Sequence, residues 1–198
     1  MMDLVCKTSP ETFWFSLKNN LIKNLKNDKD SFHENYTDNR RWTNFMTQII
    51  KNDVATDLQY TAIAQEYWPR MDIAFFDTET NENWDKWALE IGIEIENNPK
   101  TWYQECHKLM MISCGLKVLI GYKYNSDKKF QKEIDKIETI YTSRKYNRLN
   151  DKWLLIFGPM DSSTEIDRDY YVYKMENIKK DNDYECKITL IEKVDIFK

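Results

Sequence analysis

Glutamates recur along one short apolar stretch, and carboxylates gathered in this way can bind a metal ion. Glu90, Glu94 and Glu96 lie within residues 87–96. The residues that alternate with them are apolar: Leu89, Ile91, Ile93 and Ile95. This alternation predicts a β-strand with one acidic and one apolar face. Residues two apart on a strand are separated by about 6.6 Å, so Glu94 and Glu96 are expected to be neighbours, with Glu90 further along the same face.

Two interpretations of such an acidic face are possible. Like charges held close together raise each other's pKa unless a cation joins them, and hard oxygen ligands suit Mg²⁺, Mn²⁺ or Ca²⁺ better than zinc or copper. The alternative is a face of an antiparallel strand that simply meets water, where glutamates are ordinary. From spacing alone, the solvated face is the commoner arrangement.

The elements that must position these carboxylates begin with helical sequence. Residues 11–26 place apolar side chains at four-residue spacing, which predicts an amphipathic helix. A second helix is expected from Asp38 or Asn39, either of which is a good N-cap, to about Asn52.

Two more helices are expected after the acidic strand. The first begins with Asn98 as N-cap and Pro99 at the first helical position, and Gly115 is expected to stop it. Residues 127–146 carry apolar side chains at helical spacing and predict the second.

The other segments are typical of strands. Residues 58–67 and 71–76 are expected to be extended before the acidic strand, and the apolar residues 116–124 predict a buried strand. Further strands are expected at residues 153–157, 170–175 and 186–191.

The order of these elements predicts an α/β (α+β) fold with a mixed central sheet flanked by helices. One domain is expected over residues 1–198. Its parts are a helical region at about 10–52, a core at about 55–124, and a C-terminal helix and strands at about 125–198.

A second acid precedes the acidic strand in the core. Asp72 follows Arg70 and Met71 and begins the apolar segment 73–76; the sequence Glu94-Ile95-Glu96-Asn97, a helix and an apolar strand come later. Residues 55–124 therefore resemble the PD-(D/E)XK phosphodiesterase superfamily. The resemblance implies a restriction-endonuclease-like core, α-β-β-β-α-β, here with extra C-terminal strands.

Two positions depart from the family's pattern. Pro69 lies three residues before Asp72, and Glu96 stands where the third strand usually has a lysine. Some restriction endonucleases of the superfamily carry an E-x-E variant, and others supply the lysine from the following helix, where Lys108 is the nearest analogue. Lys108 lies about 140° from the centre of that helix's apolar stripe, so a surface lysine is the alternative.

Other candidates are weaker. Lys100 and Lys117 are alternatives for the missing lysine, and Glu66 either joins the site or forms a surface salt bridge.

The resemblance also implies a reaction. Asp72, Glu94 and Glu96 would be the ligands of Mg²⁺ or Mn²⁺, which lowers the pKa of a bound water and neutralises charge on the scissile phosphate. Glu96, or Lys108, would orient that water or take its proton.

Charge is distributed unevenly along the chain. Residues 71–97 contain eight acidic residues and one lysine, a local charge of −7, whereas residues 123–152 contain nine basic and five acidic residues, a local charge of +4. The net charge of −4 alone disfavours a nucleic-acid partner. The basic segment 123–152 could still contact nucleic acid, so this class of partner is not excluded. Lys123, Lys128 and Lys129, with Tyr122 and Tyr124, would form a phosphate-contacting edge; a solvated helix face is the alternative.

The amino-acid composition favours a protein with a packed core and gives no support for a zinc ribbon or a membrane-spanning segment. Aromatic residues make up 14% of the 198 residues, which favours a packed core. The four cysteines form no C-x-x-C pair, so no zinc ribbon is supported and buried thiols are expected. No apolar run approaches the ~20 residues of a membrane span, and we expect a cytoplasmic protein without a membrane partner.

The sequence therefore predicts a metal-dependent nuclease, a hydrolase of phosphodiester bonds, with DNA as the expected substrate. The rival hypothesis is a non-catalytic nuclease-like module for interaction or nucleic-acid binding, and the absent third-strand lysine and acidic balance favour it. A homodimer is left open.

Overall fold

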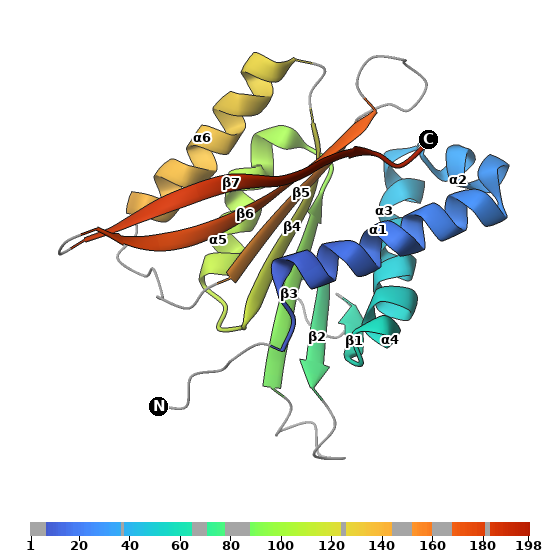
Figure 1. Cartoon of the computed structure of the whole chain (residues 1–198), viewed down its shortest axis with the longest axis horizontal. Helices are drawn as coiled ribbons and strands as arrows, with labels where there is room; N and C mark the ends of the chain where they lie inside the picture. The colour runs from blue at the N-terminus through green and yellow to red at the C-terminus, as the bar shows by residue number, and fades with distance from the viewer. Residues whose placement is uncertain are drawn as a thin grey trace.

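A mixed β-sheet forms the centre of the structure, with helices on both faces (Figure 1). The computed structural model describes residues 7–36, 38–64, 71–77, 88–123, 126–143, 152–159, 168–180 and 183–198. Within them, the strands follow one another in the sheet in chain order: β1 (Thr61–Ala64), β2 (Ile73–Asp77), β3 (Ala88–Glu96), β4 (Leu116–Lys123), β5 (Lys152–Pro159), β6 (Asp169–Lys180) and β7 (Asp183–Asp195). Strands β3, β4 and β5 are parallel to one another, and every other neighbouring pair is antiparallel.

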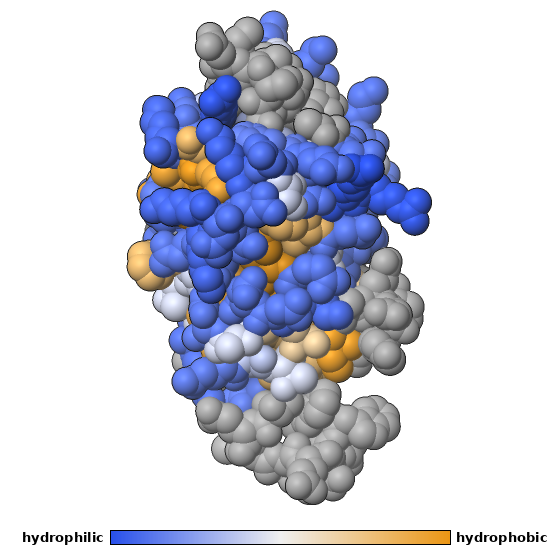
Figure 2. Space-filling view, turned by 90° about the vertical axis from the view of Figure 1, so that its right-hand side faces the viewer, coloured by the Kyte–Doolittle hydropathy of each residue, from blue (hydrophilic) through white to orange (hydrophobic). Residues whose placement is uncertain are grey.

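The N-terminal helices cover one face of the sheet, and α1 crosses the front of the sheet in Figure 1. They are α1 (Pro10–Asn27), α2 (Lys29–Tyr36), α3 (Asn39–Gln48), the π-helical turn η1 (Ile49–Val54) and α4 (Ala55–Asp57). The Ser9 side chain caps α1 by accepting a hydrogen bond from the backbone N–H of Thr12. The apolar stripe of α1 is buried with Ile91, Ile93 and Ile95 of β3. The one face of the molecule seen in Figure 2 is mostly hydrophilic, with small apolar patches.

The opposite face is covered by the 3₁₀ turn η3 (Pro99–Thr101), α5 (Trp102–Met110) and α6 (Asp127–Ser143). Trp102, Cys106 and Leu109 of α5 are completely buried, and burying a large apolar side chain stabilises the fold by about 1.5–3 kcal/mol. Gly121 of β4 lies beneath Trp102: a Cβ atom at this glycine would lie 2.6 Å from the indole Nε1. The helix therefore packs very close to the sheet.

The expected order of elements and the mixed sheet with flanking helices are confirmed, whereas several boundaries differ. Helix α2 was not predicted, and the second expected helix continues beyond Asn52 through η1 and α4. Helix α5 ends at Met110, not near Gly115, because the chain there already turns onto the sheet: the backbone N–H of Gly115 donates to the carbonyl of Glu90 at 3.0 Å. Strands β6 and β7 are longer than expected.

The predicted alternation along β3 is wrong at its first residues. The pairing of β2 with β3 shifts between Phe75 and Phe76, so that Phe75 is opposite Ile91 and Phe76 is opposite Leu89. This bulge turns Leu89 towards the face covered by α5 and α6, where it packs at the edge of that core. Beyond it, Ile91, Ile93 and Ile95 share the other face as predicted.

Two expectations from composition can be compared with the structure. Cys106, Cys114 and Cys186 are buried free thiols, as expected, and Cys6 lies outside the described residues. Among the helices of the described segments, none is long and apolar enough to cross a membrane.

Candidate functional site

The adjacent strands β2 and β3 bring two of the predicted acids together. Ile73 is opposite Ile93 in this antiparallel pair, and extending the register by one residue sets Asp72 opposite Glu94. Directly opposed residues have Cβ atoms about 4.5–5.5 Å apart. The Asp72 Oδ2 also accepts a hydrogen bond of 2.8 Å from the backbone N–H of Ile95, which fixes Asp72 against β3.

Helix α5 adds an acid and a base to this pair. Glu105 and Lys108 are three residues apart on α5 and form an ion pair. The Lys108 Nζ also lies 3.8 Å from Oε2 of Glu94. The site cluster, as we call it, therefore consists of Asp72 and Glu94 from the sheet and Glu105 and Lys108 from the helix above it.

Burial dominates the electrostatics of Glu94. Its side chain is only 3% exposed, and burial, followed by the charge of Asp72, raises its pKa to about 9. The charge of Glu105 and a hydrogen bond with Asp72 contribute to this increase in pKa, and the Lys108 ammonium opposes it. Among the described residues, no partner hydrogen-bonds the buried Oε1 of Glu94. A cation at this oxygen would relieve the cost of ionising the group.

Lys108 lies at the exposed margin of the site cluster, with its ammonium beside two nearly buried carboxyls. Burial lowers its pKa, but the ion pair with Glu105 and the charges of Glu94 and Asp72 outweigh burial and raise that pKa above its usual value. Its side chain is 52% exposed, and its ammonium nevertheless contacts the carboxyls of Glu94 and Glu105.

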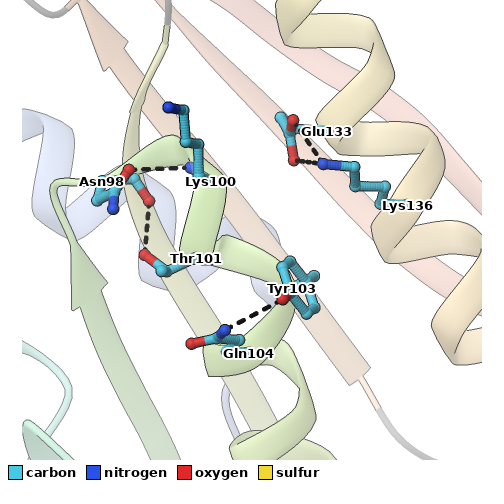
Figure 3. A network of polar contacts seen from close by, with 7 residues as sticks. All are labelled: Asn98, Lys100, Thr101, Tyr103, Gln104, Glu133 and Lys136. Atoms are coloured by element: carbon cyan, nitrogen blue, oxygen red, sulfur yellow. Dashed lines mark hydrogen bonds and ion pairs between the residues drawn. The ribbon is translucent and has the colours of Figure 1, made fainter.

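Glu96 is placed differently from the other predicted acids. Its Oε1 accepts a hydrogen bond of 2.7 Å from the backbone N–H of Asn98, in the turn that leads into η3. Asn98 in turn accepts from the backbone N–H of Lys100 through its side chain and from the hydroxyl of Thr101 through its carbonyl (Figure 3). One oxygen of Glu96 thus stabilises the turn that starts the helix.

The alternative lysines lie elsewhere. Lys100 is exposed in η3, and the side chain of Lys117 in β4 is buried with its ammonium 5.2 Å from the ring centroid of Trp153. Glu66, Pro69 and Arg70 lie outside the described residues.

The lysines predicted to contact nucleic acid do not form a common exposed edge. Lys123 is buried, and its ammonium lies 3.0 Å from Asp127 and 4.1 Å from the ring centroid of Tyr171. Tyr122 is buried as well, whereas Lys128 and Lys129 are exposed in the first turn of α6. Tyr124 falls outside the described segments.

The carboxylates of the site cluster suit a hard divalent cation. Within the described ranges, no group of three or more His, Cys, Asp or Glu side chains has the geometry to hold a metal ion. Mg²⁺, however, is commonly bound through one or two carboxylates, with waters and substrate phosphates completing its shell. Asp72 and Glu94, with the buried Oε1 of Glu94, fit that smaller set of ligands.

Glu105 was not predicted as a site residue, although the sequence contains a signal for it. It lies three residues after Trp102 and four before Leu109, which puts an acid on the buried side of an amphipathic helix. An acid at such a position needs a partner, and Lys108 at i+3 provides one.

No family model, curated protein or solved structure matches this chain.

Proposed function

We propose that this protein is a divalent-metal-dependent phosphodiesterase of the PD-(D/E)XK kind, with DNA as its expected substrate. The observation that carries the proposal is the site cluster, in which a buried glutamate meets the aspartate that directly precedes the neighbouring strand and a lysine from the following helix. The order of helix, three strands, α5 and β4, with β3 parallel to β4, supports a restriction-endonuclease-like core.

Each residue of the cluster has a role in this proposal. Asp72 and Glu94 would hold Mg²⁺ or Mn²⁺, which when bound supplies an acidic water and a positive charge for the scissile phosphate. Lys108 would take the part of the lysine that β3 lacks, because its ammonium lies beside Glu94 and can donate to a phosphate oxygen or to the attacking water. Glu96 is assigned the smaller part of holding the turn at Asn98.

The test is a cleavage assay on single-stranded, double-stranded and branched DNA and on RNA, with Mg²⁺, Mn²⁺ or EDTA. Asp72→Asn and Glu94→Gln should each lower kcat/KM by about 10²–10⁴. Glu133→Gln on α6 is the matched control, because Glu133 is also a buried helical acid paired with a lysine. Equal cleavage by wild type and Glu94→Gln would assign the activity to a contaminant or to another site.

Thermal unfolding adds a measurement that does not depend on activity. Metal at about 100 times its dissociation constant should stabilise the wild type by about 2.7 kcal/mol, and neither Asp72→Asn nor Glu94→Gln should show that increase in Tm. A metal response that survives in the double mutant contradicts the assignment of these ligands.

A second candidate function is a non-catalytic module with this fold. The observation that favours it is Glu96, which replaces the family's lysine and whose Oε1 is engaged by the backbone of Asn98. A module predicts no metal-dependent cleavage of any substrate in the panel, and no Tm increase with Mg²⁺ or Mn²⁺.

A further inference from the structure

Glu105 and Lys108 approach Glu94 as a unit. Both belong to α5, and the ion pair between them lies over the end of β3, where the Lys108 ammonium is 3.8 Å from Glu94. Glu105 also raises the pKa of Glu94, so its charge acts on that carboxyl as well.

The exposures of the two side chains show which one can hold the other. The Glu105 side chain is 11% exposed, whereas that of Lys108 is 52% exposed. A half-exposed lysine side chain has many rotamers available, and holding it in one of them costs conformational entropy. The ordered acid is therefore the anchor, and the lysine is the group that needs one.

We propose that Glu105 is a positioning residue that holds the Lys108 ammonium beside Glu94. This inference rests on the proposed function, to which it adds a residue that touches neither the metal nor the phosphate. Without Glu105, the ammonium is free to turn into solvent and is present at the reaction centre for only part of the time.

The test compares Glu105→Gln, Glu105→Asp, Lys108→Met and the double variant Glu105→Gln/Lys108→Met in the cleavage assay. Removing a residue that orients a group of the active site typically lowers activity 10–100-fold. The kcat of Glu105→Gln should therefore fall by that factor, while KM for DNA changes little. Glu105→Asp keeps the charge and should recover part of the loss. In the Lys108→Met background, Glu105→Gln should have no further effect, because the residue it positions is gone.

Glu133→Gln, which removes the same type of anchor from Lys136, is the control and should leave kcat unchanged. The inference is overturned if Glu105→Gln retains wild-type kcat, or if its loss is undiminished in the Lys108→Met background. If Glu105→Gln fails to fold by circular dichroism, a kcat of Glu105→Asp equal to that of Lys108→Met overturns it, and an intermediate kcat supports it. A wild type that is inactive on every substrate refutes the proposed function instead.

Discussion

Helices α5 and α6 carry the same local motif with different surroundings. Each has a nearly buried glutamate three residues before a half-exposed lysine: side-chain exposure is 11% and 52% for Glu105 and Lys108, and 10% and 41% for Glu133 and Lys136. Lys136 bonds both oxygens of Glu133, at 2.8 and 2.7 Å (Figure 3). Its ammonium otherwise lies 6.0 Å from the Tyr103 ring centroid.

The difference between the two pairs lies in what the sheet presents to each lysine. The Lys108 ammonium lies 3.8 Å from Glu94, a buried carboxyl whose neighbour Asp72 directly precedes the adjacent strand. Lys136 reaches a tyrosine on the neighbouring helix. An i, i+3 acid–lysine pair is thus a common stabilising feature of helices. Such a pair can take part in binding or catalysis only where the sheet beneath it contributes charged groups of its own.

The largest expected difference between the two pairs is catalytic. Lys108→Met should reduce metal-dependent cleavage by about 10²–10⁴, the usual range for losing one acid–base participant. Lys136→Met should leave the rate within about twofold, because this lysine approaches none of the site cluster. Steady-state rates of both variants on one duplex substrate measure the contrast, and equal losses in the two would remove the distinction between the pairs.

A smaller difference is expected in the pH dependence of stability without metal. Burial and the charge of Asp72 raise the pKa of Glu94 to about 9 in the folded protein, compared with 4.5 for an ordinary glutamate. Between these values the folded state binds more protons than the unfolded state, so the free energy of unfolding should fall as pH rises from about 4.5 to 9. Urea midpoints measured in EDTA should follow this decline in wild type and Glu133→Gln.

Glu94→Gln removes the titrating group and keeps its shape, so its urea midpoint should change less over the same pH range. A decline in Glu94→Gln as steep as that of wild type would assign the pH dependence to another group.

The smallest effect concerns the α6 pair itself. Glu133→Gln should change the free energy of unfolding by no more than about 0.5 kcal/mol, since a helical ion pair with one exposed partner contributes little. Lys136→Met should cost about 1 kcal/mol, because it removes the partner of the buried Glu133. Chemical denaturation of the two single variants and the double variant measures their coupling. A coupling well above 1 kcal/mol would show that this pair also belongs to a larger charged network.

Much of the fold follows from local patterns in the sequence. The N-cap and proline at residues 98–99 and the isoleucines at 91, 93 and 95 predicted the turn into α5 and the buried face of β3. Helix α2 escaped prediction because its buried residues, Phe32 and Tyr36, are too few to show helical periodicity. The bulge at the start of β3 escaped for another reason: it depends on pairing with β2, which no local pattern records.

The site was predictable only in part. Glu94 was named from the alternation along its strand and from the superfamily resemblance, and Asp72 from that resemblance; their position opposite one another depends on the pairing of β2 with β3, which no local pattern records. Glu96 was grouped with Glu94 by alternation and by the E-x-E motif, neither of which can reveal that one of its oxygens accepts a hydrogen bond from the backbone of Asn98. The reach of Lys108 also escaped an argument from helical angle, because that angle fixes the direction of Cβ and not where a long side chain ends.

The closeness of α5 to the sheet depends on a residue without a side chain. Gly121 is paired with Glu96 across the two strands, and the Trp102 indole above this glycine donates to the Glu96 carbonyl at 3.2 Å. A methyl group at position 121 would collide with that indole and push the helix outward, carrying Glu105 and Lys108 with it. The absence of a side chain at Gly121 therefore lets α5 lie close enough to the sheet for the Lys108 ammonium to approach Glu94.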